Sequence, residues 1–451
     1  MNIRKPLRIS LFIVGSALGL LILFLVIGVA PLNRDIDYKP LLDTMNSRIE
    51  AVDEHPAPSG GVFTVGYSKV NLTPSEPVAT AGYGKRLGKL YKSVHDSIYV
   101  RSLVIDNGTR RVAIVSADLL IIPPSVTAVL EMELPEIGFT LDNTYLGATH
   151  SHNSIGNWAA GVASFLYGTY EDSIVRFIAD KIKVSIEGAT KNMLPSTINV
   201  DSVALSEGVY NRVTDSGPVD PLIRTIEIER SDSSRLLFVS YTAHATCLFS
   251  RDLFLSADYP GELTTTLESQ GDYALAMFMA GAVGSHGPAA PEGGWNCVDW
   301  MANGISQKIL QHRDRQRMMK NTIIEMHRVP LALTALQPKI FHDWRLRAWL
   351  FRGAFGQYPN FISVLRIGDI VLLGTPGDFS GEFNASLDSL AAQSDVFPIV
   401  TSFNGGYIGY LTPSKYYDVD HYETQLMNWY GPGTGDYIHQ VLEKLLETVT
   451  E

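Results

Sequence analysis

The chain has 451 residues, 45% of them hydrophobic, which is enough to bury the core of one large domain or two. Its formal net charge of -11 excludes a nucleic-acid-binding protein, because such a protein needs a basic surface. The two cysteines, Cys247 and Cys297, are too few for a disulfide framework, and they are either one bridge or two buried thiols.

The first expected element is an apolar helix at residues 9–30. An uncharged run of this length can cross a hydrocarbon core of about 30 Å. The basic residues of segment 1–8 precede it and place the N-terminus in the cytoplasm. We therefore expect a single-pass signal anchor, with the rest of the chain outside the cytoplasm. A cleaved signal peptide that ends near Ala30 is the alternative.

Residues 31–61 are polar with scattered prolines and glycines, and we interpret them as a stalk. Over residues 62–451, short apolar runs typical of buried strands alternate with helical patterns. This alternation predicts a mixed α/β fold in one large domain, with a β-sheet core flanked by helices. The strands are expected at residues 111–116, 143–148, 236–242, 274–280, 370–374 and 396–402, and the helices at 165–187 and 437–446.

Polar side chains that can bind a metal follow three of these strands, namely His150 with His152, then His244, and finally Asp378. Because His150 and His152 are two residues apart, extended backbone would point both side chains the same way. Two imidazoles and one carboxylate match a catalytic zinc site, in which one position stays open for water. Taken singly, each residue has an ordinary explanation, since an Asp after Pro-Gly often caps a helix.

Short motifs in a fixed order extend these observations along the chain. They are Ala81–Gly84, Arg101–Asp106, Val115–Asp118, Ala148–His152, Asn211–Arg212, Ala243–Thr246, Thr375–Asp378, Gly409–Thr412 and Tyr422–Glu423. Through them, the chain from about Phe63 to Leu446 resembles the neutral (non-lysosomal) ceramidases, which are zinc amidases that hydrolyse N-acylsphingosine.

The resemblance implies that Zn²⁺ is the cofactor and that His150, His244 and Tyr410 are three of its ligands. The carboxylate ligand is expected to be Asp378, at a position where the family has glutamate. Glu382, one helical turn further on, is the alternative because a shorter carboxylate must come closer to the metal.

Four further residues correspond to catalytic or substrate-binding positions of the family. Tyr422 would stabilise the oxyanion, and His152 would position substrate or carry a proton. Arg212 would lie near the substrate, with a surface ion pair as the alternative. Ser285 is the candidate for the family's loop serine, although Ala282 stands where the family has aspartate.

The implied reaction is cleavage of the N-acyl amide bond of ceramide, or of a related N-acyl lipid, into a fatty acid and a sphingoid-type amine. Zinc would lower the pKa of its bound water to about 7 and so supply the nucleophile. The expected partners are a lipid substrate and, through the N-terminal helix, a membrane. The segment Trp344–Arg352 is both basic and aromatic, so it lies either on the membrane surface or in ordinary packing.

Other interpretations remain open. The protein could be a metal-dependent amidase or esterase for another acylated substrate, or a non-catalytic, membrane-anchored binding protein on the same fold. A serine hydrolase that uses Ser285 with His286 is disfavoured, because the loop lacks the spacing of a nucleophile elbow. Adjacent side chains also point apart on extended backbone. The oligomeric state is not predicted.

Overall fold

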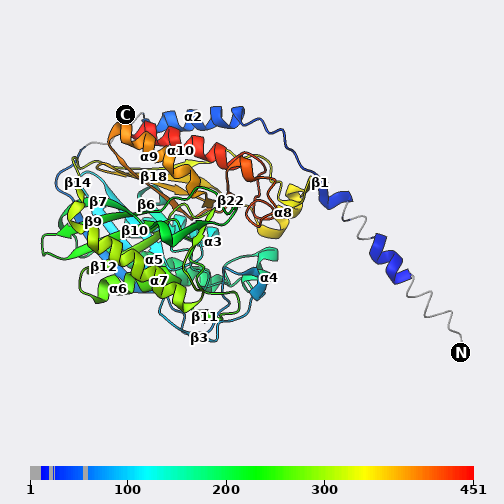
Figure 1. The fold of residues 1–451 in the computed structure, drawn as a ribbon, viewed down its shortest axis with the longest axis horizontal. Coiled ribbons are helices and arrows are strands. Elements are labelled where there is room, and N and C mark those ends of the chain that lie inside the picture. Colours follow the sequence, from blue (N-terminus) through cyan, green and yellow to red (C-terminus); the bar gives the residue numbers. More distant parts are fainter. Residues whose placement is uncertain (1–11, 20–23, 25, 54–58, 451) are drawn as a thin grey trace.

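The N-terminal segment carries part of the predicted membrane anchor. The structure, a computed structural model, describes residues 12–19, 24, 26–53 and 59–450 (Figure 1). Part of the segment expected to span a membrane, 9–30, therefore lies outside the described residues. Residues 12–19 are helical and their side chains are exposed. Within the described part of the chain, no helix combines the length and the hydropathy that crossing a bilayer requires.

The last residues of that segment differ from the prediction. Val29–Pro31 form a strand, β1, instead of the end of a helix. It pairs antiparallel with β17 (Trp344–Leu346), which also pairs with β16 (Lys339–Phe341). The chain therefore reaches the domain as an added strand, with its backbone hydrogen bonds satisfied by β17.

The expected stalk at 31–61 also contains an element that the sequence analysis missed. Residues Lys39–Asp53 form helix α2, which lies along α10 (Thr434–Thr450) on the outside of the domain (Figure 1). Met45, Ile49 and Val52 follow helical spacing and are buried against the domain core. The many polar residues of this helix face away from the contact, which is why composition alone indicated a stalk.

The main sheet has nine strands within the described residues. Eight of them follow the order β12-β10-β9-β7-β2-β4-β5-β6, and β14 pairs with β7. The pairs β10–β12 and β5–β6 are parallel. The bounds are β2 (Thr64–Asn71), β4 (Tyr99–Asp106), β5 (Arg111–Ala117), β6 (Thr144–Ala148), β7 (Leu194–Ala204), β9 (Leu222–Arg230), β10 (Arg235–Tyr241), β12 (Leu275–Ala280) and β14 (Arg317–Met318).

A second, four-stranded sheet packs against the first. Its order is β15-β18-β19-β21, with β19 and β21 parallel. The bounds are β15 (Ile324–Pro330), β18 (Phe361–Ile367), β19 (Ile370–Thr375) and β21 (Phe397–Ser402). Tyr145 and Met277 of the large sheet share one buried cluster with Leu365 and Ile399 of the small sheet, so the main core lies between the two sheets.

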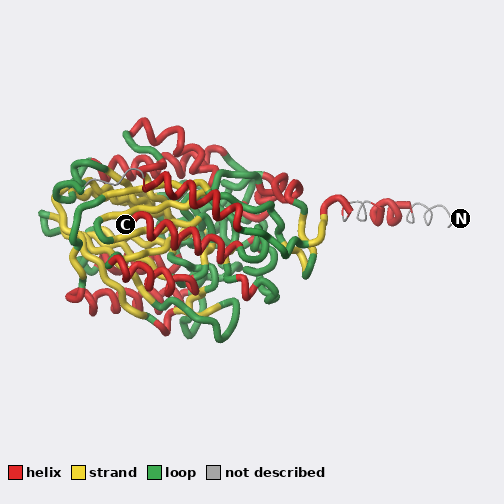
Figure 2. The backbone as a smooth tube through the Cα atoms, turned by 90° about the horizontal axis from the view of Figure 1, so that it is seen from above, coloured by secondary structure: helices red, strands yellow, loops and turns green. Residues whose placement is uncertain are grey.

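Helices cover the outer faces of both sheets, which Figure 2 shows as a yellow interior bordered by red helices. On the large sheet these are α3 (Pro124–Glu133), α5 (Asp172–Thr190), α6 (Asp258–Ser269) and α7 (Trp295–His312). On the small sheet they are α9 (Asn384–Ala391), α10 and α2. The predicted mixed α/β fold, with a sheet core and flanking helices, is confirmed.

The predicted strands agree with the observed ones to within a residue or two. The helix expected at 165–187 is instead two helices, α4 (Ser164–Tyr167) and α5, because Gly168 between them has a φ of 91°. The two cysteines form a disulfide, Cys247–Cys297, which ties the loop after β10 to α7.

The basic and aromatic segment Trp344–Arg352 is split between β17 and helix α8 (Ala348–Phe355). Trp344 and Trp349 are exposed, whereas Phe351 is buried against Phe355 and Trp429. Only part of the segment therefore lies on the surface. Phe351 belongs to the interior because consecutive residues of α8 point in different directions around the helix.

Candidate active site

The loops that follow three strands bring their polar residues to one place. His150 follows β6, His244 follows β10, and Asp378 comes three residues after β19. Asp378 begins a two-residue strand, β20 (Asp378–Phe379), which pairs in parallel with β22 (Tyr410–Leu411). Asp378 and Tyr410 are register partners in this pair, so the pairing itself sets the tyrosine beside the carboxylate.

The four predicted metal ligands converge. Nε2 of His150 lies 3.5 Å from Oδ1 of Asp378, and Nε2 of His244 lies 3.3 Å from the same oxygen. The hydroxyl of Tyr410 lies 3.1 Å from Nε2 of His244. All four side chains are buried.

Backbone carbonyls orient the two imidazoles. Nδ1 of His150 is 2.7 Å from the carbonyl oxygen of Leu120, and Nδ1 of His244 is 2.8 Å from that of Val283. Since a carbonyl only accepts, both Nδ1 atoms carry the proton, and both Nε2 atoms present a lone pair toward Asp378. This arrangement is typical of histidines that bind a metal through Nε2.

The Oδ1 atom of Asp378 supports the same conclusion. Although it is fully buried, it has no hydrogen-bond partner among the described residues. A buried carboxylate oxygen without a partner is costly, whereas a cation among the nearby donors would satisfy it. Two imidazole nitrogens, a carboxylate and a phenol oxygen therefore fit a zinc ion in the chemistry of their donor atoms.

Burial also sets the protonation states of the donors. It lowers the pKa of His150 and of His244 to about 3, which keeps both imidazoles neutral at physiological pH. Burial raises the pKa of Asp378, with the imidazole of His150 opposing that shift. Burial raises the pKa of Tyr410 well above its usual value, so a phenolate there requires an adjacent positive charge.

His152 lies beside the cluster, but the backbone between it and His150 is not extended as expected. Its Nε2 lies 3.2 Å from Nε2 of His150, and ring nitrogens of His150, His152 and His244 all lie within 4.8 Å of one another. However, His150 has a φ of 63°, in the left-handed region, so the expectation of extended backbone was wrong. The ring of His150 stacks on Phe403, with centroids 4.1 Å apart.

Two residues that the sequence analysis did not single out hold the backbone of His152. The buried guanidinium of Arg86 donates a hydrogen bond of 2.6 Å to the carbonyl oxygen of His152. Gly82 packs so closely that a Cβ atom there would lie 2.5 Å from the Cα of His152. The motif Ala81–Gly84 therefore packs against the backbone of His152, and the close contact leaves no room for a side chain at position 82.

The structure distinguishes between the two candidate carboxylates. Glu382 accepts a hydrogen bond from Asn211 at 2.8 Å and pairs with Lys415 at 2.8 Å, away from the imidazoles. Asp378, in contrast, has one oxygen facing both histidines, while its Oδ2 accepts a hydrogen bond of 2.8 Å from Tyr407. The role of Tyr407 was missed, although its position just past the strand at 396–402 was a usable signal.

Tyr422 and Arg212 lie at the same site. The ring of Tyr422 is 5.9 Å from that of Tyr410, and its side chain is half-exposed. Nε of Arg212 lies 2.6 Å from Oε1 of Glu423, which is fully buried. Arg212 thus forms an ion pair, as the alternative expectation held, but the pair is at the site rather than on the outer surface.

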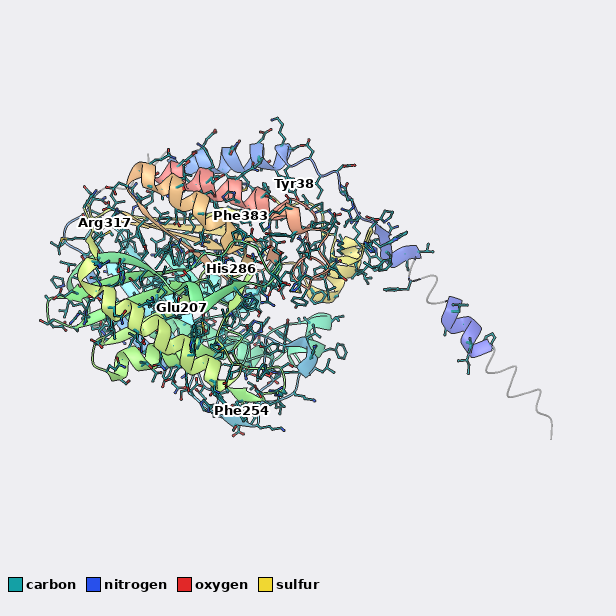
Figure 3. The ribbon with its side chains drawn as sticks, in the orientation of Figure 1. Tyr38, Glu207, Phe254, His286, Arg317 and Phe383 are labelled. Carbon is teal, nitrogen blue, oxygen red and sulfur yellow. A yellow bond between two sulfur atoms is a disulfide. The ribbon has the colours of Figure 1, made fainter. Side chains whose placement is uncertain are left out.

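The placement of Ser285 differs from the expectation. Its Oγ atom is fully buried and lies 2.7 Å from Nδ1 of His286 and 2.6 Å from Oγ of Ser380. The two adjacent side chains do meet, which corrects the argument that they point apart. His286 lies at the centre of the molecule (Figure 3), and its Nε2 accepts a hydrogen bond from the backbone N–H of Asp220. Its Nδ1 therefore carries the proton and cannot activate Ser285 as a nucleophile.

The donor cluster borders a cavity of about 860 Å³, and His244 is the one of the four donors that does not line it. His150, His152, Asp378 and Tyr410 line it, together with Arg212, Tyr422 and many apolar side chains. Among the latter are Leu120, Ile121, Trp158, Ala163, Leu166, Leu346, Phe351, Phe355, Leu426 and Trp429. Among the residues that the structure describes, Ser285 does not line this cavity. Apolar walls with a few polar groups at one place are typical of a site for a lipid or another apolar ligand.

A family model described as neutral/alkaline non-lysosomal ceramidase, N-terminal, matches residues 63–300. The chain belongs to this ceramidase family. The resemblance inferred from the ordered motifs is thereby confirmed. The matched region contains His150, His152, Arg212 and His244, whereas Asp378, Tyr410 and Tyr422 follow it.

The fold of this ceramidase-family chain is also similar to two solved structures. One is the neutral ceramidase of Pseudomonas aeruginosa, with 17% sequence identity and a TM-score of 0.73, over 86% of this chain and 74% of that one. The other is a ceramidase complexed with C2, with 16% identity and a TM-score of 0.72, over 86% of this chain and 75% of that one. At these identities the likeness concerns the fold.

Proposed function

We propose that this protein is a zinc-dependent amidohydrolase that cleaves the N-acyl amide bond of ceramide, or of a related N-acyl lipid, into a fatty acid and a sphingoid-type amine. The observation that carries the proposal is the convergence of His150, His244, Asp378 and Tyr410 at the edge of a largely apolar cavity. Membership of the ceramidase family supports ceramide as the substrate class.

The zinc ligands in this proposal are the two Nε2 atoms, Oδ1 of Asp378 and the hydroxyl of Tyr410. When bound, zinc supplies Lewis acidity toward the amide carbonyl and makes water nucleophilic at neutral pH. The chain supplies the rest of the chemistry. The carbonyls of Leu120 and Val283 and the hydroxyl of Tyr407 hold the ligands in place before substrate arrives.

Two side chains act on the amide itself. Tyr422 donates its hydroxyl proton in a hydrogen bond to the carbonyl oxygen, which gains negative charge as water adds to the carbon. His152 is neutral because burial lowers its pKa well below its usual value, so it can take a proton from the attacking water. It then returns that proton to the nitrogen as the C–N bond breaks, and the amine leaves uncharged.

Arg212 and the cavity walls account for binding. The guanidinium of Arg212 is held by Glu423 at the polar end of the cavity, where it can interact with hydroxyl groups or with the product carboxylate. The apolar walls, including Phe351, Phe355 and Trp429, suit the hydrocarbon chains of an N-acyl lipid.

The test is fatty-acid release from ceramide in mixed micelles by the full chain, before and after zinc is removed and restored. We expect activity to disappear on chelation, to return with zinc, and to be absent in His244→Ala. Activity that survives metal removal would contradict the proposal. Metal-dependent hydrolysis of other acyl amides or esters, with ceramide untouched, would identify the alternative substrate class. Substoichiometric zinc without hydrolysis would indicate a binding protein.

We further propose that the protein is a single-pass membrane protein whose catalytic domain lies outside the cytoplasm. The apolar run that starts at residue 9 and ends where β1 begins, together with the preceding basic residues, supports this topology. The disulfide Cys247–Cys297 supports it as well, because such bonds persist in oxidising compartments. Protease digestion of intact cells, compared with permeabilised cells, tests the topology. Protection of the domain under both conditions would contradict it.

A further inference from the structure

Exposed apolar side chains occur on the two segments that form one side of the cavity. Val162 and Phe165 project from the 3-10 helix Gly161–Ala163 and from α4, and Phe165 is 72% exposed. Trp344 on β17 and Trp349 on α8 are also exposed, Trp349 to 56%. We call these four side chains the apolar rim. Large apolar residues clustered in water are unfavourable for a soluble surface and mark an interaction site.

The two segments of the rim are neighbours in space. A Cβ atom on Gly161 would lie 2.4 Å from the carbonyl oxygen of Ala354 in α8, so the two helical segments pack backbone against backbone. Residues next to the rim point inward and line the cavity, namely Ala163 and Leu166 from one segment and Leu346 and Phe351 from the other. The rim is therefore continuous with the apolar walls of the proposed lipid site.

The charge of these segments differs from that of the whole chain. Residues 158–170 and 344–358 contain no Asp or Glu, and 344–358 contains Arg345, Arg347 and Arg352, whereas the chain carries a net charge of -11. Arginine beside tryptophan is the combination found where proteins rest on phospholipid headgroups. The rim is thus complementary to a bilayer surface, while acidic residues predominate over the chain as a whole.

The N-terminal segment is attached to the same place. The N–H of Arg347 donates to the carbonyl oxygen of Gly28 at 2.9 Å, and the guanidinium groups of Arg345 and Arg347 donate to the carbonyls of Pro31 and Val29. The chain at Gly28–Pro31 is therefore held beside β17 and α8. Figure 1 shows β1 and α8 together at one end of the molecule.

We propose that the apolar rim docks onto a lipid bilayer, so that the cavity receives its N-acyl lipid laterally from the membrane. This inference rests on the proposed function for the identity of the lipid, but the docking itself does not. The side chains of Phe165 and Trp349 would lie among the acyl chains just below the headgroups, and the arginines at headgroup level.

Depth measurements by spin labelling test the docking directly. Both native cysteines are in the disulfide, so a single introduced cysteine can be labelled in the full chain, reconstituted in phosphatidylcholine nanodiscs with or without phosphatidylserine. At Phe165→Cys and Trp349→Cys we expect high accessibility to oxygen and low accessibility to a water-soluble nickel complex. Labels at Met132→Cys, also exposed but on α3, are the matched control and should show the reverse. Rim labels as accessible to nickel as the control would overturn the proposal.

A kinetic comparison tests the lateral entry of substrate. Neither Phe165 nor Trp349 lines the cavity, so replacing both with serine should leave hydrolysis of a short-chain ceramide in solution unchanged. Hydrolysis of long-chain ceramide in vesicles should fall by about tenfold or more, since two buried apolar side chains are lost from the contact. Met132→Ser is the control. Lateral entry would be overturned if the double variant hydrolysed both substrates as fast as the unmodified chain. It would also be overturned if the variant lost activity equally toward both. Failure of all hydrolysis in the unmodified chain would instead refute the proposed function, while the depth measurement would stand.

Discussion

Tyr407 donates a hydrogen bond of 2.8 Å to Oδ2 of Asp378, whose other oxygen faces His150 and His244. Asp378 is fully buried at this contact, and the hydroxyl of Tyr407 leaves Oδ1 free for a cation. The tyrosine thus determines which carboxylate oxygen is presented to the imidazoles.

Replacing Tyr407 with phenylalanine should weaken zinc binding by about 10- to 100-fold, because the partner that orients the ligand is removed. Competition with a chromophoric chelator measures the affinity. Tyr416→Phe is the matched control, since Tyr416 bonds to Glu382 instead. Equal affinities for the two variants would show that Asp378 does not depend on Tyr407.

The two carboxylates can be separated by metal analysis. Asp378→Asn should lose most bound zinc, because a neutral amide is a poor ligand and the charge of the site changes. Glu382→Gln should retain stoichiometric zinc, since Glu382 bonds to Asn211 and Lys415 away from the histidines. Elemental analysis of the purified full-length variants provides the measurement. The opposite pattern would identify Glu382 as the ligand.

Ser285→Ala should lower stability more than catalysis. The substitution leaves Nδ1 of His286 and the hydroxyl of Ser380 without their buried partner, at a cost of about 1–3 kcal/mol. Urea unfolding and kcat for ceramide are the two measurements. A loss of kcat by several orders of magnitude with unchanged stability would support serine chemistry and contradict the placement of this residue outside the cavity.

Asp258 should make stability depend on pH. Burial raises the pKa of Asp258 to about 6, above about 3.9 for an unfolded chain. The folded state therefore binds its proton more tightly, and the stabilisation present below pH 4 is lost as pH rises through 6. The difference is on the order of 3 kcal/mol. Between pH 4.5 and 7.5, the free energy of urea unfolding should therefore fall less in Asp258→Asn than in the unmodified chain. Exposed Asp215→Asn is the control, and parallel curves for both variants would contradict the prediction.

The disulfide should contribute substantially to stability. Cys247 and Cys297 are separated by 50 positions, and closing a loop of that length stabilises the folded state by about 4 kcal/mol in the chain-entropy description. Cys247→Ala, Cys297→Ala and the double variant should therefore lose similar amounts in urea unfolding. Peptide mapping without reduction checks the bond itself. Two unmodified thiols in the mature protein would refute it.

The sequence predicted the strands well, and it singled out side chains that the structure brings together, because both depend largely on local pattern. Apolar runs of strand length identify buried strands, and a ligand such as His244 directly after one marks the edge where loops can gather. The ordered motifs then added Tyr410, which no periodicity singles out. Because these patterns and motifs are local, the strands and the site residues could be predicted by residue number.

What the sequence did not reveal depends on contacts between distant segments. Helix α2 buries its apolar face only where it packs along α10, and the left-handed backbone of His150 occurs where its ring stacks on Phe403. The contact between Ser285 and His286 likewise arises from the buried loop in which they sit. The last two features have no periodic signal, because tertiary packing and not local propensity determines them. Helix α2 has a short apolar stripe at helical spacing, but its polar composition outweighed that signal.

The parallel pairing of β20 with β22 has a consequence for how the protein matures. His150 and His244 belong to the first 300 residues. Asp378 and Tyr410 follow later in the chain, and they become neighbours only when β20 pairs with β22. Because synthesis runs from the N-terminus, these four side chains cannot all come together until the segment around residue 410 has been made.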